Sequence, residues 1–452
     1  MSADLRLAWL LTRGSDQREW WRVLLTAVGA ALATGIGLVV AALLPLQGHH
    51  EVTVGAGLLD EPGTRAGVIV ALMLLLIPVA GFLGQCARIG AVHRDRRLAG
   101  LRLAGATPGQ VRRIAALESG LACLVGSAAA TLVAVPTLLA LWHHPDPLSS
   151  AGMVLVAVLV PVLGAVVSAV ALRRVVASPL GWIRRVRPAA GPGRLFRVAT
   201  GLLVLLALYI ATTPFFGNPV DFALGPFTVF AMCLLAGAVS VWLTGASARQ
   251  LGEGFAARAR RPELLIAAER LRDDPWAAAR THAAVLLVTV VASGFTGVRE
   301  VLLADLHRSS REGSLGTDLS FYTSGLGLTA AAVLVALALV LTALAVGTAE
   351  SLATRRRGLA AQAAAGVPHG VLARAMLLET ALPLAPAVAA AGVGGLAIGI
   401  WYGSATSEHM SVPVPFTALL VPFAVYAACL LAAATSLPLL RRSVRPAELR
   451  YA

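Results

Sequence analysis

The sequence predicts an all-α polytopic membrane protein, on three observations. Of the 452 residues, 58% are apolar and only 13% are charged, whereas about a quarter of the residues of a soluble domain are charged. The apolar residues gather in runs that are long enough to cross a bilayer. The charged residues lie mainly between these runs. These observations exclude a soluble globular protein.

The apolar runs number ten, and each is close to the length of about 20 residues that a helix needs to cross a hydrocarbon core. We expect transmembrane helices at 23–44, 66–89, 114–141, 151–172, 195–213, 222–243, 283–298, 326–347, 375–401 and 416–437. The loops between them are short. We therefore expect no large extracytoplasmic domain.

The arginines predict the orientation, because short Arg-rich loops stay in the cytoplasm. With both termini in the cytoplasm, the arginines left outside are Arg65, Arg299, Arg308 and Arg311. The prediction is a multi-pass protein of the cell inner or plasma membrane with both termini cytoplasmic. A net charge of +14 could indicate nucleic acid, but the arginines flank apolar spans and form no basic face interleaved with aromatic residues. We expect the lipid bilayer, and no nucleic acid, as a partner.

Two stretches of the chain are similar to each other. Residues 94–118 and 355–379 agree at ten of 25 ungapped positions, and each runs from an arginine cluster through a short helix, a Gly and a Pro into an apolar helix. They predict a parallel internal repeat, arranged as 4+2+4 helices. The units are 1–190, a two-helix connector at 191–250, and 251–452.

The first of these stretches contains the signals of a tight turn between two helices. Thr107 can cap the second helix, with Pro108 at its first position and Gln110 placed to complete a capping box. We therefore expect the chain to turn between Gly105 and Pro108.

The second stretch keeps Gly366 and Pro368, but Val367 stands before the proline where a capping residue would be expected. A valine side chain cannot accept a hydrogen bond from a helix terminus. We expect this second turn to be held less well than the first.

Two glutamates recur at the same place in the repeat, about one turn into the third and ninth spans. One interpretation is that Glu118 and Glu379 each pair with an arginine of their own or the neighbouring connector, for example Arg113 or Arg374. The alternative is a boundary charge that reaches the membrane surface. No expected span carries a charge near its middle, which disfavours an ion-driven carrier.

Motifs for catalysis are missing from the sequence, which has no Walker A, HExxH or GxSxG pattern. We expect no catalytic residue, metal or cofactor on this chain. The two histidine pairs, His49/His50 and His143/His144, favour plain surface residues over a metal site, and the cysteines fit helix packing: Cys86, Cys123, Cys233 and Cys429.

The first stretch resembles the signature of the FtsX-like permease family, the membrane subunits of type VII ABC systems. The residues that carry the resemblance are Arg94, Arg96, Leu98, Leu101, Ala104, Gly105, Ala106, Thr107, Gln110, Glu118 and Ser119. The second stretch is similar through Arg355, Arg357, Leu359, Ala365, Gly366, Glu379 and Thr380, but it has no equivalents of Leu101, Thr107 and Gln110. The large extracytoplasmic domain that is usual in this family is missing from both units.

The resemblance implies an ABC transporter permease that works with a separate cytoplasmic ATPase, two copies of which would bind one chain. It implies export or extraction of a lipophilic or peptide substrate such as an antibiotic; the alternative is a subunit that transmits ATPase motion as a signal without transport. The residues implied to couple to the ATPase are Arg94, Arg96, Arg97, Leu98, Leu101, Gly105, Ala106, Thr107, Pro108, Arg355, Arg356, Arg357, Leu359, Gly366 and Pro368.

Overall fold

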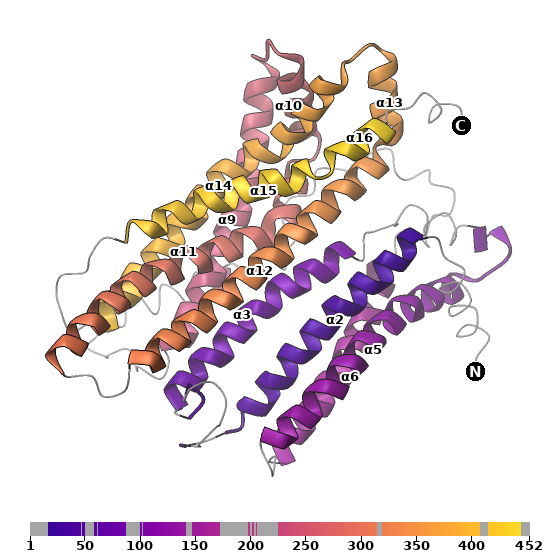
Figure 1. The fold of residues 1–452 in the computed structure, drawn as a ribbon. Coiled ribbons are helices and arrows are strands. Elements are labelled where there is room, and N and C mark those ends of the chain that lie inside the picture. The colour runs from indigo at the N-terminus through magenta and orange to yellow at the C-terminus, as the bar shows by residue number, and fades with distance from the viewer. Residues whose placement is uncertain are drawn as a thin grey trace. The chain divides into compact units, whose positions relative to one another are not determined.

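The computed structural model of the protein describes most of the chain. The described residues are 17–46, 48–49, 58–60, 62–86, 100–101, 103–141, 147–171, 198, 201–202, 205, 225–313, 319–406 and 415–443. Every regular element among them is a helix (Figure 1). The predicted all-α class is confirmed.

The helices follow one another along the chain with short connections (Figure 1). Their bounds are α2 Gln17–Leu43, α3 Pro62–Cys86, α5 Pro108–Leu141, α6 Pro147–Ala171, α9 Gly225–Ala256, α10 Pro262–Asp273, α11 Pro275–Glu312, α12 Leu319–Thr354, α13 Arg356–Ala364, α14 His369–Thr406, α15 Leu420–Ala434 and α16 Leu437–Ser443, with a 3-10 turn at Thr417–Leu419.

Nine segments of the described chain are long and apolar enough to cross a membrane. They are α2, α3, α5, α6, α9, α11, α12, α14 and the segment Thr417–Leu440, which includes α15. They correspond to nine of the ten expected spans and confirm a polytopic membrane protein. The remaining expected span, at 195–213, lies outside the described residues except for a few isolated positions.

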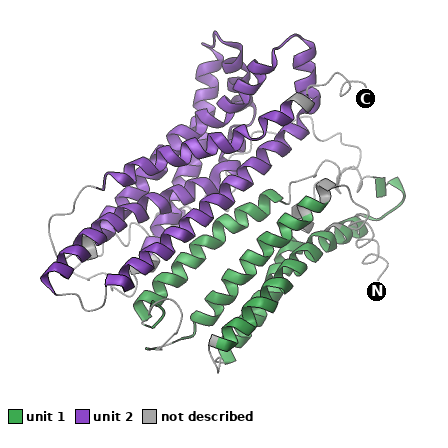
Figure 2. Cartoon of the chain, viewed as in Figure 1, with its two compact units in different colours: residues 1–187 green, residues 188–452 purple. Residues whose placement is uncertain are grey.

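The chain divides into two compact units, residues 1–187 and 188–452 (Figure 2). In the first, α2 packs against α3, α5 and α6, and α5 packs against α6. In the second, α11 and α14 pack most extensively against each other, and α9 packs against α10, α11 and α14. The division at 190 and 250 into two four-helix units and a connector stays a prediction.

Each unit contains one pair of helices whose backbones touch. In the first unit, a Cβ on Gly126 of α5 would lie 2.0 Å from the carbonyl oxygen of Ala27 in α2. In the second, a Cβ on Gly395 of α14 would lie 2.2 Å from the carbonyl oxygen of Val290 in α11. Real atoms do not approach this closely, so both contacts require glycine, as is common where membrane helices associate.

A buried arginine organises the connection between α2 and α3. Arg65, in the first turn of α3, is only 2% exposed. Its guanidinium donates hydrogen bonds to the carbonyl oxygens of Leu46 (2.8 Å), Gly48 (3.0 Å), Leu59 (2.9 Å) and Asp60 (2.9 Å). One side chain thus holds both ends of this connection against the first unit.

Candidate functional site

The second of the two similar stretches is described from end to end. Its short helix α13 ends at Gly366, whose φ of +90° lies in the left-handed region that favours glycine. The Gly366 N–H donates to the Ala363 carbonyl (2.9 Å), and the Val367 N–H donates to the Gln362 carbonyl (3.1 Å). These two bonds form a Schellman motif, which satisfies the last carbonyls of a helix.

An apolar cluster holds this turn from the side. Leu352, Leu359, Leu372 and Leu440 are each no more than 3% exposed, and Val367 packs against them. A hydrophobic contact of this kind often accompanies the Schellman motif. Burial of Val367 therefore takes the place of the polar cap that the sequence lacks.

The first turn has the same backbone form. Gly105 has a φ of +97°, and the Ala106 N–H donates to the Leu101 carbonyl (3.0 Å). The capping box that the sequence predicts is present: the Thr107 N–H donates to Gln110 Oε1 (2.8 Å), and the Gln110 N–H donates to Thr107 Oγ1 (3.2 Å). The box leads directly into α5 at Pro108.

The cap positions of the two turns correspond one residue later than the sequence indicates. The carbonyl of Thr107 accepts the Val111 N–H (3.1 Å), and the carbonyl of Pro368 accepts the Leu372 N–H (3.3 Å). Pro368, and not Val367, therefore stands where Thr107 stands in the first turn. A proline has no side-chain acceptor, so α14 begins without a polar cap.

The arginines of the two stretches are described unequally. Arg94, Arg96, Arg97 and Leu98 lie outside the described residues. In the second stretch, Arg355 directly precedes α13, and Arg356 and Arg357 form its first turn.

The glutamate of the second stretch joins three elements. Glu379 of α14 accepts hydrogen bonds from Nη1 of Arg355 (2.7 and 3.0 Å) and from Nη1 of Arg270 in α10 (3.1 Å). The side chains are 22%, 38% and 19% exposed, in that order. The partner is thus the connector's first arginine; Arg374, the example that the sequence offers, is exposed.

Sequence reasoning missed Arg270, although a signal for it exists. It lies in the last turn of α10, a short helix that precedes α11 and is not itself a span. A basic residue just before a membrane helix lies at the depth where α14 carries Glu379. In the first unit, Glu118 of α5 is only 3% exposed.

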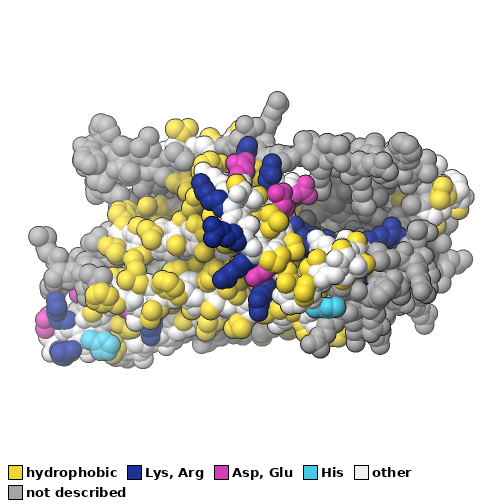
Figure 3. All heavy atoms as spheres, turned by 90° about the horizontal axis from the view of Figure 1, so that it is seen from above, with side chains coloured by type: hydrophobic (Ala, Val, Ile, Leu, Met, Phe, Trp, Pro, Cys, Tyr) yellow, Lys and Arg dark blue, Asp and Glu magenta, His cyan; other side chains and the backbone are white. Residues whose placement is uncertain are grey.

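Charged side chains gather at the end of the second unit that carries α10 and α13. Figure 3 looks onto the top of the view in Figure 1, and there arginine and acidic side chains lie together among hydrophobic ones. Besides the Glu379 cluster, Arg280 pairs with Asp274 (2.6 Å) where α10 meets α11. This end is therefore polar, whereas the helix segments behind it are apolar.

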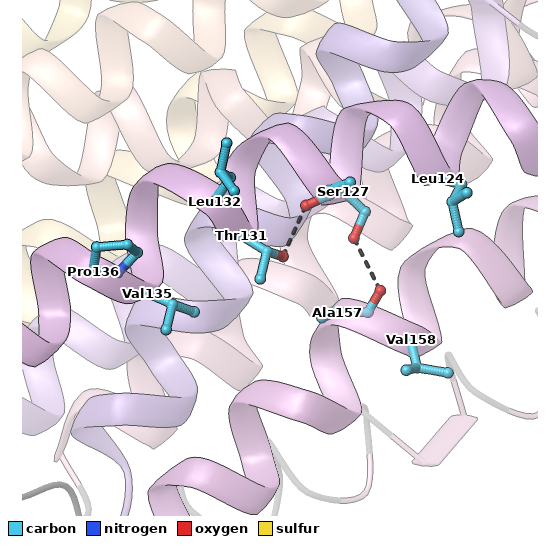
Figure 4. Close-up of a pocket in the computed structure, with 9 residues that line it drawn as sticks. Leu124, Ser127, Thr131, Leu132, Val135, Pro136, Ala157 and Val158 are labelled. Carbon is cyan, nitrogen blue, oxygen red and sulfur yellow. Dashed lines mark hydrogen bonds between the residues drawn. The ribbon is translucent and has the colours of Figure 1, made fainter.

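The first unit has a groove between α5 and α6. It measures about 510 Å³ and is lined by Leu124, Ser127, Ala128, Thr131, Leu132, Val135, Pro136, Ala157 and Val158. Figure 4 shows Ser127 Oγ donating to the Ala157 carbonyl across the two helices (2.9 Å), and Thr131 Oγ1 donating back to the Ser127 carbonyl (2.8 Å). Because these hydroxyls are satisfied by backbone, the groove presents a largely apolar surface.

Comparison with known protein families gives one match. Residues 68–177 match the family model described as FtsX-like permease C-terminal, a segment that contains most of α3, the first turn, α5 and α6. No curated protein gives a significant match to the chain. The matched residues all belong to the first unit, so the second unit as a repeat of it stays a prediction. The match supports the resemblance seen in the sequence and identifies the chain as a protein of the FtsX-like permease family, whose members are ABC transporter-type permeases.

Proposed function

We propose that this chain is the membrane subunit of an ABC transporter, in which a separate cytoplasmic ATPase drives the export or extraction of a lipophilic or peptide substrate such as an antibiotic. The two turns dock on the ATPase. Each carries the ATPase movement into the helix that follows it, α5 in the first unit and α14 in the second.

The contact of Glu379 with Arg355 and Arg270 is the observation that carries this proposal. A docking element transmits a displacement only if it is tied to the helix that must move. Arg355 at the start of α13 holds Glu379 of α14 at 2.7 Å, and the Schellman turn joins the other end of α13 to the start of the same helix. The short helix is therefore fixed to α14 at both ends, so it moves with α14 as one body.

Exposed positions on both stretches are available for the ATPase. Leu103, two residues before Gly105, is 77% exposed, and Ala364 at the matching position of α13 is also exposed. An exposed leucine beside a polar turn suits the apolar part of a protein interface.

Two turns on one chain support a stoichiometry of two ATPase subunits per permease. The mass of the purified complex tests this expectation. One chain with two ATPase subunits is expected, and two chains for each pair of ATPase subunits would contradict it.

The proposal requires both turns to face the cytoplasm. With the native cysteines replaced, a cysteine at Gly109 should be protected from an impermeant thiol reagent in intact cells, whereas cysteines at Pro147 and Gly325 should react. Labelling at Gly109 from outside would contradict the orientation.

Reconstitution distinguishes transport from signalling. The chain and its ATPase are placed in lipid vesicles, and ATP hydrolysis is measured together with the movement of lipophilic dyes and peptides. Transport requires both to depend on Glu379, so that Glu379→Gln lowers both. Hydrolysis that depends on Glu379 without movement of any of these compounds favours the alternative, a subunit that transmits motion.

A further inference from the structure

A cavity of about 400 Å³ lies inside the second unit, a volume within the range of small-molecule sites. Its walls come from the beginning of α11, the end of α12, the beginning of α14 and the junction of α15 with α16. All four are ends of spanning segments at the side of the unit that carries α10 and α13 (Figure 1). The cavity therefore lies at the depth of lipid headgroups.

One wall carries a surplus of positive charge. Arg270 and Arg355 both line the cavity and share the single carboxylate of Glu379. Each guanidinium has five N–H donors, and the hydrogen bonds that the two arginines make to side chains use only their Nη1 atoms. An anionic group with several oxygens, such as a phosphate, suits the remaining donors.

The other wall offers a buried acceptor. His282 is 4% exposed, and its Nδ1 lies 2.7 Å from the Ala278 carbonyl. That carbonyl can only accept, so Nδ1 carries the hydrogen and Nε2 of the neutral ring is an acceptor. Nε2 is buried and has no hydrogen-bond partner in the described part of the chain. A buried polar atom without a partner is costly, and this one therefore indicates a ligand with a hydrogen-bond donor.

Neighbouring hydroxyls add to the same acceptor surface. Thr281, Thr348 and Ser436 line the cavity, and each donates its hydrogen to a carbonyl of its own helical segment, at 2.9, 2.9 and 2.7 Å. Their oxygens can therefore only accept from a ligand. Asp273 adds a carboxylate to the lining, which suits a cationic donor.

We infer that this cavity binds the headgroup of phosphatidylethanolamine, with the phosphate at Arg270 and Arg355 and the ammonium at the acceptor surface around His282. Both signs of charge in the lining match a zwitterionic head. Leu344, Leu377 and Leu437 in the same lining provide apolar contact for the first carbons of the acyl chains. The inference is independent of the ATPase, because lipid binding is measured on the permease alone.

Native mass spectrometry of the purified chain tests this site, with phosphatidylethanolamine, phosphatidylglycerol and phosphatidylcholine as probes. We expect phosphatidylethanolamine to be retained most strongly, since phosphatidylcholine has no N–H donor and phosphatidylglycerol has no cation. Equal retention of phosphatidylcholine, preferred retention of phosphatidylglycerol, or no lipid retained would each overturn the assignment.

Variants of two histidines on α11 provide a matched pair. His307 makes the same contact to a carbonyl four residues earlier, at 2.6 Å, but is exposed. His282→Phe keeps the ring and removes the acceptor, so it should weaken phosphatidylethanolamine retention about fivefold to tenfold, whereas His307→Phe should leave it unchanged. Thr348→Val, which removes one hydroxyl at nearly constant volume, gives a second reading if His282→Phe fails to fold. Retention that is unchanged in both His282→Phe and Thr348→Val contradicts the site.

Discussion

The two turns share a backbone and differ in what holds it. Both place a glycine at positive φ, +97° in one and +90° in the other, and both close with a hydrogen bond to the carbonyl five residues earlier. Around the first turn the described support is polar and local, a capping box between Thr107 and Gln110. Around the second it is the leucine cluster that packs against Val367, together with the charges that meet at Glu379.

The difference shows that a turn can be fixed either from within or from outside. A capping box stabilises a helix start by itself, so the first turn is a local structure. The second turn depends on residues far away in the sequence, from Arg270 to Leu440. Mutations far from the second turn should therefore loosen it, whereas the first should respond mainly to changes in its own residues.

Removal of the shared carboxylate should give the largest effect. Glu379→Gln leaves Arg270 and Arg355 together without a counter-charge. Because the three side chains are only partly buried, we expect a loss of about 2 kcal/mol, below the range of about 3–5 kcal/mol for fully buried pairs. The measurements are the thermal unfolding midpoint of the purified chain and permease-stimulated ATP hydrolysis. Arg249→Gln, which breaks the exposed pair with Glu253, is the control and should change neither.

The glycines at positive φ test the shared backbone. An added Cβ meets no atom within 4 Å at Gly105 or at Gly366, so Gly105→Ala and Gly366→Ala introduce only backbone strain. We expect about 1–2 kcal/mol at each turn, read as faster amide exchange in residues 105–111 or 366–372. A large effect at one glycine and none at the other would show that the two turns do not share this conformation.

The capping box should affect only the first turn. Thr107→Ala removes the acceptor for the Gln110 N–H, at a cost of about 1 kcal/mol. We expect amide exchange at Gln110 to rise about fivefold, with no change in residues 366–372. If exchange at Gln110 stays the same, the box does not stabilise the turn.

The smallest change concerns Val367. The sequence alone suggests that a threonine there would supply the missing cap, but the structure places Val367 against leucines and Pro368 at the cap position. Val367→Thr should therefore cost about 0.5–1 kcal/mol, because it puts a hydroxyl against an apolar cluster. Faster amide exchange in residues 366–372 is expected, and slower exchange would mean that the threonine acts as a cap after all.

The sequence predicted what depends on local chemistry and composition. Apolar runs give the spans, and the spacing of Thr107, Pro108 and Gln110 gives the first turn, because a capping box involves only neighbouring residues. The partners of Glu379 could be predicted only as a class. Arg270 lies 109 positions away from it, and such a contact depends on how α10 packs against α14. The cavity around His282 is hidden for the same reason, since its walls come from helices that are distant in the sequence.

Cysteine crosslinking gives the most direct test of docking at both turns. Leu103→Cys and Ala364→Cys are introduced one at a time after replacement of the four native cysteines, which are buried. Both positions are exposed, so neither change should disturb the fold. If both turns dock, each cysteine forms a crosslink to the purified partner ATPase with a short bifunctional thiol reagent, and ATP protects or enhances the two sites alike. Absence of a crosslink at both positions, in a complex that still hydrolyses ATP, would contradict the assignment of these turns as the coupling elements.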